Sequence, residues 1–472
     1  MNGVLVSATH KSSGKTIVAL GLAAALVRRG ASVQTFKKGP DYIDPLWLGR
    51  AAGRPCRNLD FRTMSHDEIL ASFRTHAEGV DLAIVEGNKG LFDGMDVEGT
   101  DCNAALARLL GAPVVLVVDT RGMTRGIAPL VKGYESFGEN LHIAGIILNQ
   151  VGGPRHEGKL RAALERYTDV PVLGAVGRHP EAAIAERHLG LVPANEADRA
   201  DDRIAAIADI IERDVDIERL GVVACGLAPF RGGREPLAAG RVRAQDVRIA
   251  IARDPAFGFY YPDDLEALAR AGAELVPFDT LHDARLPEAD GLFIGGGFPE
   301  TQSRALARNE AMRRDIRGAL EAGMPAYAEC GGLMYLCRSL TWQGGRHEMV
   351  GFVPGDAVMK DRPVGRGYVR LRETGAGPWP GAKGAGRAFA AHEFHHATLE
   401  NLPDGLTYAY EVERGHGIDG RRDGLVLGNL LAGFSHQRDT AANRWAERFV
   451  GFVRARGFRQ GARTIEAAAA AG

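Results

Sequence analysis

One stretch near the N-terminus has the residue types and spacing of a phosphate-binding loop. The sequence VLVSATHKSSGKT runs from an apolar, strand-like segment into a helical pattern and ends in Gly14, Lys15 and Thr16. Backbone N–H groups of such a loop, together with the N-terminus of the following helix, favour an anion. Lys15 would reach the outer phosphates of a nucleotide, and the Thr16 hydroxyl would be a ligand of Mg²⁺. The predicted nucleotide-binding residues of the loop are Lys11, Ser12, Ser13, Gly14, Lys15 and Thr16.

The loop departs from the usual G-x-x-x-x-G-K-[ST] pattern because Thr9 stands where the first glycine is expected. A plain strand–helix turn with a surface lysine is therefore an alternative, although the strand and helix patterns on both sides favour a nucleotide site. Lys11 could add a second cation for the phosphates or simply be solvated. The motif does not say what the γ-phosphate is used for.

Acidic residues follow the next strand-like runs, where a metal ligand is needed. KKGPDYIDP places Asp41 and Asp44 after the second run, and LAIVEGNKGLFDG places Glu86 at the end of the third. Because ligands of open α/β sheets bind beyond the carboxyl ends of the strands, we predict a Mg²⁺ site of Thr16, Asp41 and Glu86. Each carboxylate alone could be a surface acid or a helix cap. Asp119, after a later run, repeats the placement more weakly.

A cysteine far along the chain has the setting of a nucleophile. MPAYAECGGLMYL places Cys330 between a short strand-like run and a helical one, with Gly331 and Gly332 directly behind it. A sharp turn of this kind exposes the side chain, lets the following N–H group serve an oxyanion, and puts the sulfur at a helix N-terminus, which favours the thiolate. The alternative is a small buried hydrophobic residue, the class to which we assign Cys56, Cys102, Cys225 and Cys337.

A thiolate hydrolase also needs a base. GFSHQRD offers His436 after an apolar run, on the same side as Cys330 if the two strands are parallel. AAHEFHHATL offers three more histidines, His392, His395 and His396, whose role could equally be structural or a substrate contact. GLFIGGGFPE ends another run with Gly295, Gly296 and Gly297, and we predict Gly296, Gly297 and Gly331 as the oxyanion donors.

The elements around these residues alternate between strands and helices. The apolar runs GVLVSA, SVQTF, DLAIVEG, PVVLVVD and IAGIILNQV are separated by helical patterns, which predicts a parallel sheet covered on both faces. Alternation resumes with VRIAIARD, and the pattern becomes more β-like towards the C-terminus. We therefore predict an α/β protein of two tandem domains, 1–211 and 247–455, with a Gly-, Pro- and Arg-rich linker, 212–246, and a flexible tail, 456–472.

Composition narrows the function classes. A chain of 472 residues is long enough for two or three domains, and an apolar share of 45% is typical of a soluble globular protein. The net charge of −1 gives no field that would attract nucleic acid or an anionic membrane, and no apolar run is long enough to span a bilayer. The first strand-like run begins too early for a signal peptide, and the five scattered cysteines indicate a reducing compartment, so we expect a cytoplasmic protein.

Taken together, the motifs resemble those of the cobyrinic acid a,c-diamide synthase family over roughly residues 1–455. The motifs are HKSSGKT, KKGPDYIDP, VEGNKGLFDG, IGGGFPE, YAECGGLMYL, HEFH and SHQRD. The resemblance implies a P-loop domain like that of dethiobiotin synthetase, followed by a class I glutamine amidotransferase domain of the cobyric-acid-synthase type. It also implies ATP, Mg²⁺ and L-glutamine as cofactor and co-substrates, a tetrapyrrole substrate, and a homodimer in many members.

The resemblance also implies roles for individual residues. Cys330 would attack the carboxamide of glutamine and His436 would activate the thiol, with no third acid in this subtype. ATP would phosphorylate an acetate carboxylate of a corrin-type ring, and the ammonia released from glutamine would displace the phosphate, at two acetates in turn. The implied substrate residues are Tyr42, Asp44 and Asp93, and Asn149 corresponds to a position that contacts adenine in related P-loop folds.

The sequence does not decide which macrocycle is the substrate. Cobyrinate or hydrogenobyrinate is the first expectation, but the ending NRWAERFVGFV resembles a branch that occurs with dissimilatory sulfite reductase genes and is proposed to amidate sirohaem. Two further hypotheses keep only part of the pattern. One is a partitioning ATPase of the deviant P-loop type, in which Lys11 acts across a dimer and Cys330 has no task. The other is a dethiobiotin-type carboxylase with an inert second domain.

Overall fold

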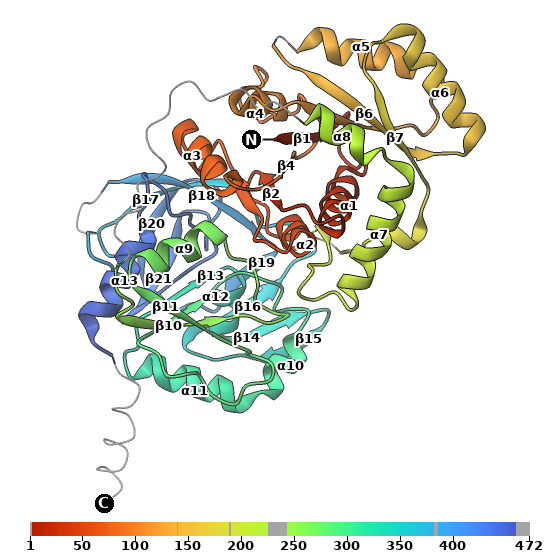
Figure 1. The fold of residues 1–472 in the computed structure, drawn as a ribbon. Coiled ribbons are helices and arrows are strands. Elements are labelled where there is room, and N and C mark those ends of the chain that lie inside the picture. Colours follow the sequence, from red (N-terminus) through yellow and green to blue (C-terminus); the bar gives the residue numbers. More distant parts are fainter. Residues whose placement is uncertain (1, 139, 188–189, 225–242, 382–385, 459–472) are drawn as a thin grey trace, which may run out of the picture. The chain divides into compact units, whose positions relative to one another are not determined.

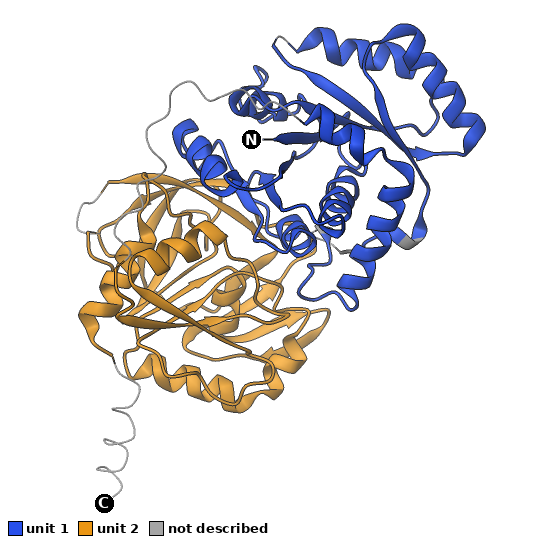
Figure 2. Cartoon of the chain, viewed as in Figure 1, with its two compact units in different colours: residues 1–238 blue, residues 239–472 orange. Residues whose placement is uncertain are grey.

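The computed structural model describes residues 2–138, 140–187, 190–224, 243–381 and 386–458. The chain divides into two compact units, residues 1–238 and 239–472, which Figure 2 shows in two colours. Both units are α/β, as predicted, and each is described by itself.

The first unit is built on a parallel sheet of seven strands (Figure 1), in the order β3-β2-β4-β1-β5-β6-β7. The strands are β1 Gly3–Ala8, β2 Val33–Lys38, β3 Arg57–Leu59, β4 Leu82–Glu86, β5 Val114–Asp119, β6 Ile143–Val151 and β7 Val172–Gly177. Five of them match the predicted apolar runs. The sequence RNL of β3 is too short to give a pattern, and VLGAVG of β7 is interrupted by glycine, so neither was predicted.

Helices cover both faces of this sheet and bury an apolar core against each. The helices α1, α2, α7 and α8 contribute to one core, and α3 to α6 contribute to the other. Side chains of β1 alternate between the two cores, with Val4 and Val6 in one and Leu5 in the other. The elements are α1 Lys15–Arg28, α2 Ile43–Ala52, α3 His66–Ala77, α4 Asn103–Leu110, α5 Ile127–Phe137, α6 Pro154–Tyr167, η1 Pro180–Ala182, α7 Ala200–Asp214 and α8 Ile217–Val223, with the short strands β8 Glu186–Arg187 and β9 Gly190–Leu191.

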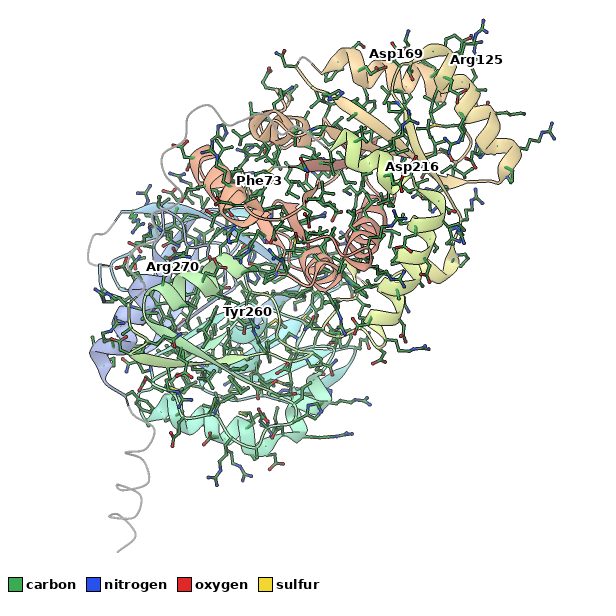
Figure 3. All side chains as sticks on the ribbon, in the orientation of Figure 1. Phe73, Arg125, Asp169, Asp216, Tyr260 and Arg270 are labelled. Atoms are coloured by element: carbon green, nitrogen blue, oxygen red, sulfur yellow. The ribbon has the colours of Figure 1, made fainter. Side chains whose placement is uncertain are left out.

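The first unit continues beyond residue 211, where the sequence predicted its end. Helix α8 lies inside the segment that we predicted to be a linker, and its Ile217 is buried in the core of the first unit. The Asp216 side chain, labelled in Figure 3, accepts a hydrogen bond of 2.9 Å from Arg219 N and so caps this helix. A helix of seven residues is too short to show an apolar period in the sequence, which explains the difference. The rest of that segment up to residue 242, with Cys225, and residues 459–472 of the predicted tail lie outside the described residues.

The second unit contains a mixed sheet of nine strands, in the order β11-β10-β12-β13-β22-β21-β20-β17-β18. Its first five strands are parallel, and the other four are antiparallel additions. The strands are β10 Val247–Ala252, β11 Ala273–Phe278, β12 Gly291–Ile294, β13 Ala326–Glu329, β17 Gly365–Glu373, β18 Ala388–His395, β20 Thr407–Arg414, β21 Arg422–Leu427 and β22 Leu430–Gly433. The antiparallel strands account for the β-like pattern of the C-terminal sequence.

A smaller sheet and five helices complete the part of the second unit that the structure describes. The sheet has the order β15-β14-β16-β19, formed by β14 Cys337–Trp342, β15 Gly345–Glu348, β16 Val353–Met359 and β19 Ala397–Glu400. The helices are α9 Pro262–Arg270, α10 Ser303–Arg308, α11 Glu310–Glu321, α12 Gly331–Leu336 and α13 Trp445–Arg456. One core of the unit includes residues of α10, α11 and α12, and a second includes residues of α9 and α13. Across the described part of the chain, no helix combines the length and the apolar character that crossing a membrane requires.

Candidate active sites in the two units

The predicted phosphate loop connects β1 to α1. Helix α1 begins at Lys15, and the preceding Gly14 has φ of 86°, a left-handed conformation that favours glycine. A Cβ atom at Gly14 would lie 2.1 Å from Nδ2 of Asn149, so the close approach of β6 also requires a glycine. The Ser13 hydroxyl donates a hydrogen bond of 2.8 Å to the carbonyl of His10, which closes the loop. The loop therefore forms a tight connection between a strand and a helix N-terminus, and its contacts with a nucleotide stay a prediction.

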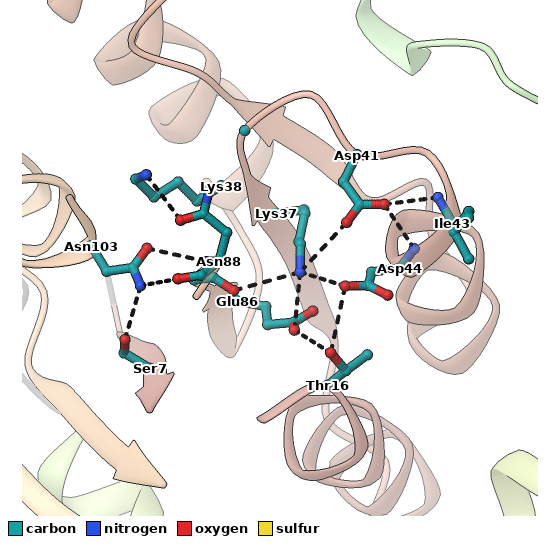
Figure 4. A network of polar contacts seen from close by, with 12 residues as sticks. Ser7, Thr16, Lys37, Lys38, Asp41, Ile43, Asp44, Glu86, Asn88 and Asn103 are labelled. Carbon is teal, nitrogen blue, oxygen red and sulfur yellow. Dashed lines mark hydrogen bonds and ion pairs between the residues drawn. The ribbon is translucent and has the colours of Figure 1, made fainter. Parts of the chain in front are cut away.

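Four charged side chains and a threonine meet at the carboxyl ends of β2 and β4 (Figure 4). Oγ1 of Thr16 donates a hydrogen bond of 2.6 Å to Oε1 of Glu86 and lies 3.5 Å from Oδ2 of Asp44. Nζ of Lys37 lies 3.0 Å from Oε1 of Glu86 and 2.5 Å from Oδ2 of Asp44. Glu86 is fully buried. We call Thr16, Lys37, Asp41, Asp44 and Glu86 the acid cluster.

The two aspartates of the acid cluster have different surroundings. Oδ1 of Asp41 accepts the N–H groups of Ile43 and Asp44, at 2.9 and 3.1 Å, and thereby caps α2. Its other oxygen is 3.8 Å from Lys37 Nζ. Asp44, which the sequence analysis gave as a substrate residue, contacts both Thr16 and Lys37. Asp44 is therefore better placed than Asp41 to share a cation with Thr16 and Glu86.

Burial and neighbouring charges set the protonation states in this cluster. Burial, with the nearby Lys37 ammonium, lowers the pKa of Lys15. Burial also acts to lower the pKa of Lys37, but the carboxylates of Asp44, Glu86 and Asp41 outweigh it and hold the pKa well above its usual value. Lys37 is thus a permanent cation among the carboxylates. Lys37 was not predicted to take part in the site, and its only signal in the sequence was its place at the end of a strand next to the acidic motif.

The donor set of the acid cluster fits a Mg²⁺ ion. Mg²⁺ prefers hydroxyl and carboxylate oxygens, and Thr16, Asp44 and Glu86 supply them within reach of one another. Oε2 of Glu86 is buried with no hydrogen-bond partner among the described residues. In this structure the ammonium of Lys37 provides the positive charge that these oxygens require.

The other residues predicted for the first unit have different surroundings. Asn149, at the end of β6, donates from Nδ2 to the carbonyl of Ser13 at 2.8 Å, so it contacts the phosphate loop itself. Oδ2 of Asp93 accepts the N–H of Gly90 at 2.9 Å. The remaining members are Lys11 and Ser12, which are exposed, Tyr42, which is buried and directly precedes α2, and Asp119, which pairs with Arg121 at 2.6 Å. Their proposed contacts with ATP or substrate remain predictions.

In the second unit, Cys330 lies on a sharp turn between β13 and α12. Its φ and ψ are 47° and −101°, a strained conformation for a residue with a side chain. Its N–H donates to the carbonyl of Gly433 at 2.8 Å, and the residue is 6% exposed. The turn is therefore the predicted elbow, with the sulfur directly before the first residue of a helix.

His436 lies beside this turn because β13 and β22 are parallel neighbours. Their register pairs Glu329 with Gly433, which confirms the parallel pairing on which the prediction of His436 depended. The carboxylate of Asp423 accepts the N–H groups of Phe434 and Ser435, at 3.0 and 2.9 Å, and holds the segment that leads to His436. Cys330 is a neighbour of the His436 imidazole and is one of the groups that raise its pKa.

Glu329 is a functional candidate that the sequence analysis missed. Its Oε2 lies 3.2 Å from Nδ1 of His436, and both side chains are buried. Burial acts to lower the pKa of His436, but the contacts with Cys330 and Glu329 outweigh it and raise this pKa to about 10. These two neighbours therefore hold the His436 imidazole in its protonated form at neutral pH. The sequence predicted no third acid, and that prediction is not tested by this contact alone.

Glycines allow the turn and the base to approach the β12 loop. A Cβ at Gly296 would lie 2.5 Å from Cε1 of His436, so the ring packs directly over this residue. A Cβ at Gly331 would lie 3.0 Å from the carbonyl oxygen and 3.1 Å from the nitrogen of Gly297. The structure thus brings together all three glycines that we predicted as oxyanion donors.

The remaining histidines and cysteines have mainly structural surroundings. His395 stacks on Phe434 with ring centroids 3.9 Å apart, and Nδ1 of His396 lies 3.1 Å from the carbonyl of Lys360. His392 exchanges two backbone hydrogen bonds with His436, and burial, together with the neighbouring His436, lowers its pKa to about 3. Cys56, Cys102 and Cys337 are buried, as predicted.

Comparison with known proteins covers both units. Residues 4–192 match the family model described as "CobQ/CobB/MinD/ParA nucleotide binding domain", and residues 248–442 match "CobB/CobQ-like glutamine amidotransferase domain". A protein of Magnetococcus marinus named cobyrinate a,c-diamide synthase is 48% identical over 462 residues, which span 96% of this chain and 97% of that one. Proteins of the same name from Methanosarcina acetivorans and Archaeoglobus fulgidus are 41% and 40% identical, over 93% and 95% of this chain and 92% and 96% of theirs.

Proposed function

From the matches above we propose the substrate of this chain and the roles of its residues. The chain belongs to the cobyrinate a,c-diamide synthase family and is a glutamine-dependent carbon–nitrogen ligase. The substrate is cobyrinate, a tetrapyrrole of cobalamin biosynthesis. Its a and c acetate carboxylates are converted to amides with nitrogen from glutamine and energy from ATP. The observation that carries the proposal is the occurrence, in one chain, of an elbow cysteine next to His436 and a phosphate loop beside the acid cluster.

Glutamine is hydrolysed at the second unit. The Cys330 thiolate attacks the carboxamide carbon, and N–H groups of Gly297 and Gly331 stabilise the oxyanion that forms. His436 gives its proton to the leaving nitrogen, so that ammonia departs and a thioester remains. His436 then takes a proton from water, which attacks the thioester and releases glutamate.

ATP is used at the first unit. A carboxylate oxygen of the substrate attacks the γ-phosphorus, ADP leaves, and an acyl phosphate forms. Lys15 and Lys37 neutralise charge on the transferred group, and the backbone of the phosphate loop binds the phosphates. A Mg²⁺ ion held by Thr16, Asp44 and Glu86 would neutralise further phosphate charge when bound. Ammonia attacks the acyl carbon, phosphate leaves, and the amide remains.

Glutamine hydrolysis and ATP-dependent phosphorylation in one protein together make the formation of the amide possible. A carboxylate does not react with ammonia unaided at neutral pH, and free ammonia is mostly protonated and not nucleophilic. Activation of the acid by phosphorylation removes the first obstacle, and release of ammonia by the same chain, without prior protonation in bulk water, removes the second.

The test is an amidation assay with isotopically labelled glutamine. Purified protein is incubated with ATP, Mg²⁺, amide-¹⁵N-glutamine and either cobyrinate, hydrogenobyrinate or sirohaem, and the products are weighed by mass spectrometry. We expect two labelled amides on cobyrinate. Cys330→Ser should abolish the glutamine-dependent reaction and keep the reaction with added ammonium. Labelling of sirohaem alone, or of no ring, would overturn the proposed substrate.

A further inference from the structure

The carboxylate of Glu329 is held from three sides in the second unit. Oε2 lies 3.2 Å from Nδ1 of His436, and Oε1 accepts the backbone N–H of Gln437 at 2.9 Å. The hydroxyl of Tyr327 also donates to Oε1. Glu329 is 4% exposed, so these contacts are made away from water. A buried carboxylate with all of these partners has one orientation.

The local fold explains why this residue faces the base. Tyr327 and Glu329 are two residues apart on β13, so their side chains lie on the same face of the sheet. The parallel register with β22 brings Gly433 opposite Glu329, and the chain reaches His436 three residues later. Cys330 follows Glu329 directly, so one strand end delivers both the nucleophile and the acid to the same imidazole.

A second set of buried contacts fixes the backbone beside His436. Nε2 of Gln437 donates to the Tyr410 hydroxyl at 3.0 Å, and Oε1 of Gln437 accepts from Nδ2 of Asn443 at 2.9 Å. The N–H that Gln437 offers to Glu329 therefore belongs to a fixed residue. Neither Glu329 nor the segment that follows His436 can shift without loss of several buried hydrogen bonds, each of which is costly to leave unmade.

We propose that Glu329 is the positioning carboxylate of the glutaminase site, which holds the His436 ring through Nδ1 and leaves Nε2 for the Cys330 sulfur. The inference rests on the proposed glutaminase function and adds a member to its machinery. Glu329 does not touch the reacting atoms and acts through His436. A carboxylate on Nδ1 fixes the tautomer and the orientation of the ring and stabilises the imidazolium.

Other titratable groups lie near the pair of Glu329 and His436. His392, from β18, lies with its ring centroid 6.5 Å from that of His436, and its lowered pKa of about 3 makes it neutral at physiological pH. Burial raises the pKa of Tyr327 and Tyr260 above the usual value, so both phenols are uncharged, and burial also raises the pKa of the Asp264 carboxyl. Glu329 and Cys330 are the two neighbours that outweigh burial and raise the pKa of His436.

The experiment compares Glu329→Gln with Tyr327→Phe, which keeps the carboxylate and removes one of its donors. Asp356→Asn is the control, because Asp356 is another buried carboxylate of the second unit and is bonded to Arg338 and Ser339, at 2.6 and 2.8 Å. Three quantities are measured for each full-length variant: kcat/KM of glutamine hydrolysis against pH, the rate at which iodoacetamide alkylates Cys330, and the melting temperature.

We expect Glu329→Gln to lower kcat/KM about 100-fold or more. Its basic limb should move to lower pH by about 1 to 2 pH units, since removal of a neighbouring negative charge makes the imidazolium easier to deprotonate. Alkylation of Cys330 at pH 7 should slow as thiolate is lost. Tyr327→Phe should give smaller changes in the same directions, and Asp356→Asn should change the melting temperature alone.

An unchanged basic limb and an unchanged alkylation rate in a folded Glu329→Gln protein would overturn the inference. So would a loss of activity that only follows the melting temperature, as in the control. If Glu329→Gln does not fold, the inference is tested with Tyr327→Phe, through its basic limb and its rate of Cys330 alkylation. Absence of glutaminase activity in the wild-type protein is a different result, because it would overturn the proposed function instead.

Discussion

The ammonium of Lys37 lies 3.0 Å from the buried carboxylate of Glu86, in the cluster where the sequence predicts a metal ion. This contact means that a positive charge already stands among the oxygens of Thr16, Asp44 and Glu86. A divalent cation that arrives without a nucleotide must compete with that charge. With a nucleotide, the phosphates supply enough negative charge for both the lysine and the metal.

Lys37→Met should therefore allow metal to bind in the absence of nucleotide. We expect Mn²⁺, titrated by electron paramagnetic resonance, to bind at least about tenfold more tightly to the variant than to the wild type, because the competing ammonium is gone. Lys38→Met is the matched control, since Lys38 is also buried at the end of β2 but donates to Asn88 at 3.1 Å. Equal Mn²⁺ affinity of Lys37→Met and wild type would show that Lys37 does not compete with the ion.

The two aspartates of the acid cluster should differ in their effect on amidation. Asp44→Asn removes a carboxylate in contact with Thr16 and Lys37, and we expect it to lower ATP-dependent amidation with ammonium about 100-fold or more. Asp41→Asn keeps an oxygen that can cap α2 and should have a much smaller effect. Asp41→Ala loses the cap and should destabilise the unit by about 1 kcal/mol in chemical denaturation. A larger loss of amidation in Asp41→Asn than in Asp44→Asn would contradict this order and support the assignment made from the sequence.

Only part of the acid cluster could be predicted from the sequence. The strands that end in Lys37 and Glu86 are near-continuous apolar runs, so their existence and their shared edge could be predicted. Asp41 caps α2, which leaves Asp44 as the better candidate for a metal ligand. The sequence could not distinguish these two roles, because both aspartates lie within the same short motif. Lys37 was visible as a charge at a strand end, but only the folded cluster shows that three carboxylates surround it.

In the second unit, too, local patterns could be predicted from the sequence, whereas a contact between distant residues could not. Cys330 could be recognised because its elbow is a local pattern of strand, glycines and helix. The contact of Glu329 with His436 joins residues 107 positions apart and depends on the register of two strands, which the sequence does not reveal. A glutamate directly before a cysteine could as well have been a surface residue. The short elements β3 and α8 were missed for a different reason, since they are too brief to show a period.

The stability of the protein should depend on pH through His436. Its pKa in the folded protein is raised to about 10, whereas an unfolded histidine titrates near about 6.5. A raised folded pKa means that the stabilisation from protonated His436 is fully present below about pH 6.5 and is lost as the pH rises through about 10.

The stabilisation that comes from protonated His436 is measured by comparing the free energy of unfolding of the wild type with that of His436→Gln. The difference between the two proteins should be larger at pH 6 than at pH 10, by an amount on the order of 1–3 kcal/mol. His142→Gln, which changes an exposed histidine of the first unit, controls for removal of an imidazole. A difference between wild type and His436→Gln that is the same at both pH values would show that the folded protein does not favour the imidazolium.

Substitution at Gly296 should separate the two half-reactions. A Cβ at this position would lie 2.5 Å from Cε1 of His436, closer than a Cβ approaches another atom in folded proteins, so Gly296→Ala must displace the imidazole or the β12 loop. Either movement disturbs the contact between His436 and Cys330 as well as the oxyanion donors. Misplacement of a catalytic group by about 1 Å can cost about 100-fold in rate.

We therefore expect Gly296→Ala to lower glutamine hydrolysis about 100-fold while ATP-dependent amidation with added ammonium is kept, because the phosphate loop and acid cluster belong to the first unit. Gly451→Ala is the matched control, since Gly451 lies within α13 and an added Cβ there meets nothing within 4 Å. An alanine in that helix should leave glutaminase unchanged and stabilise the unit by up to about 1 kcal/mol. Glutaminase that survives in Gly296→Ala at the wild-type rate would mean that the ring of His436 can move away without loss of catalysis.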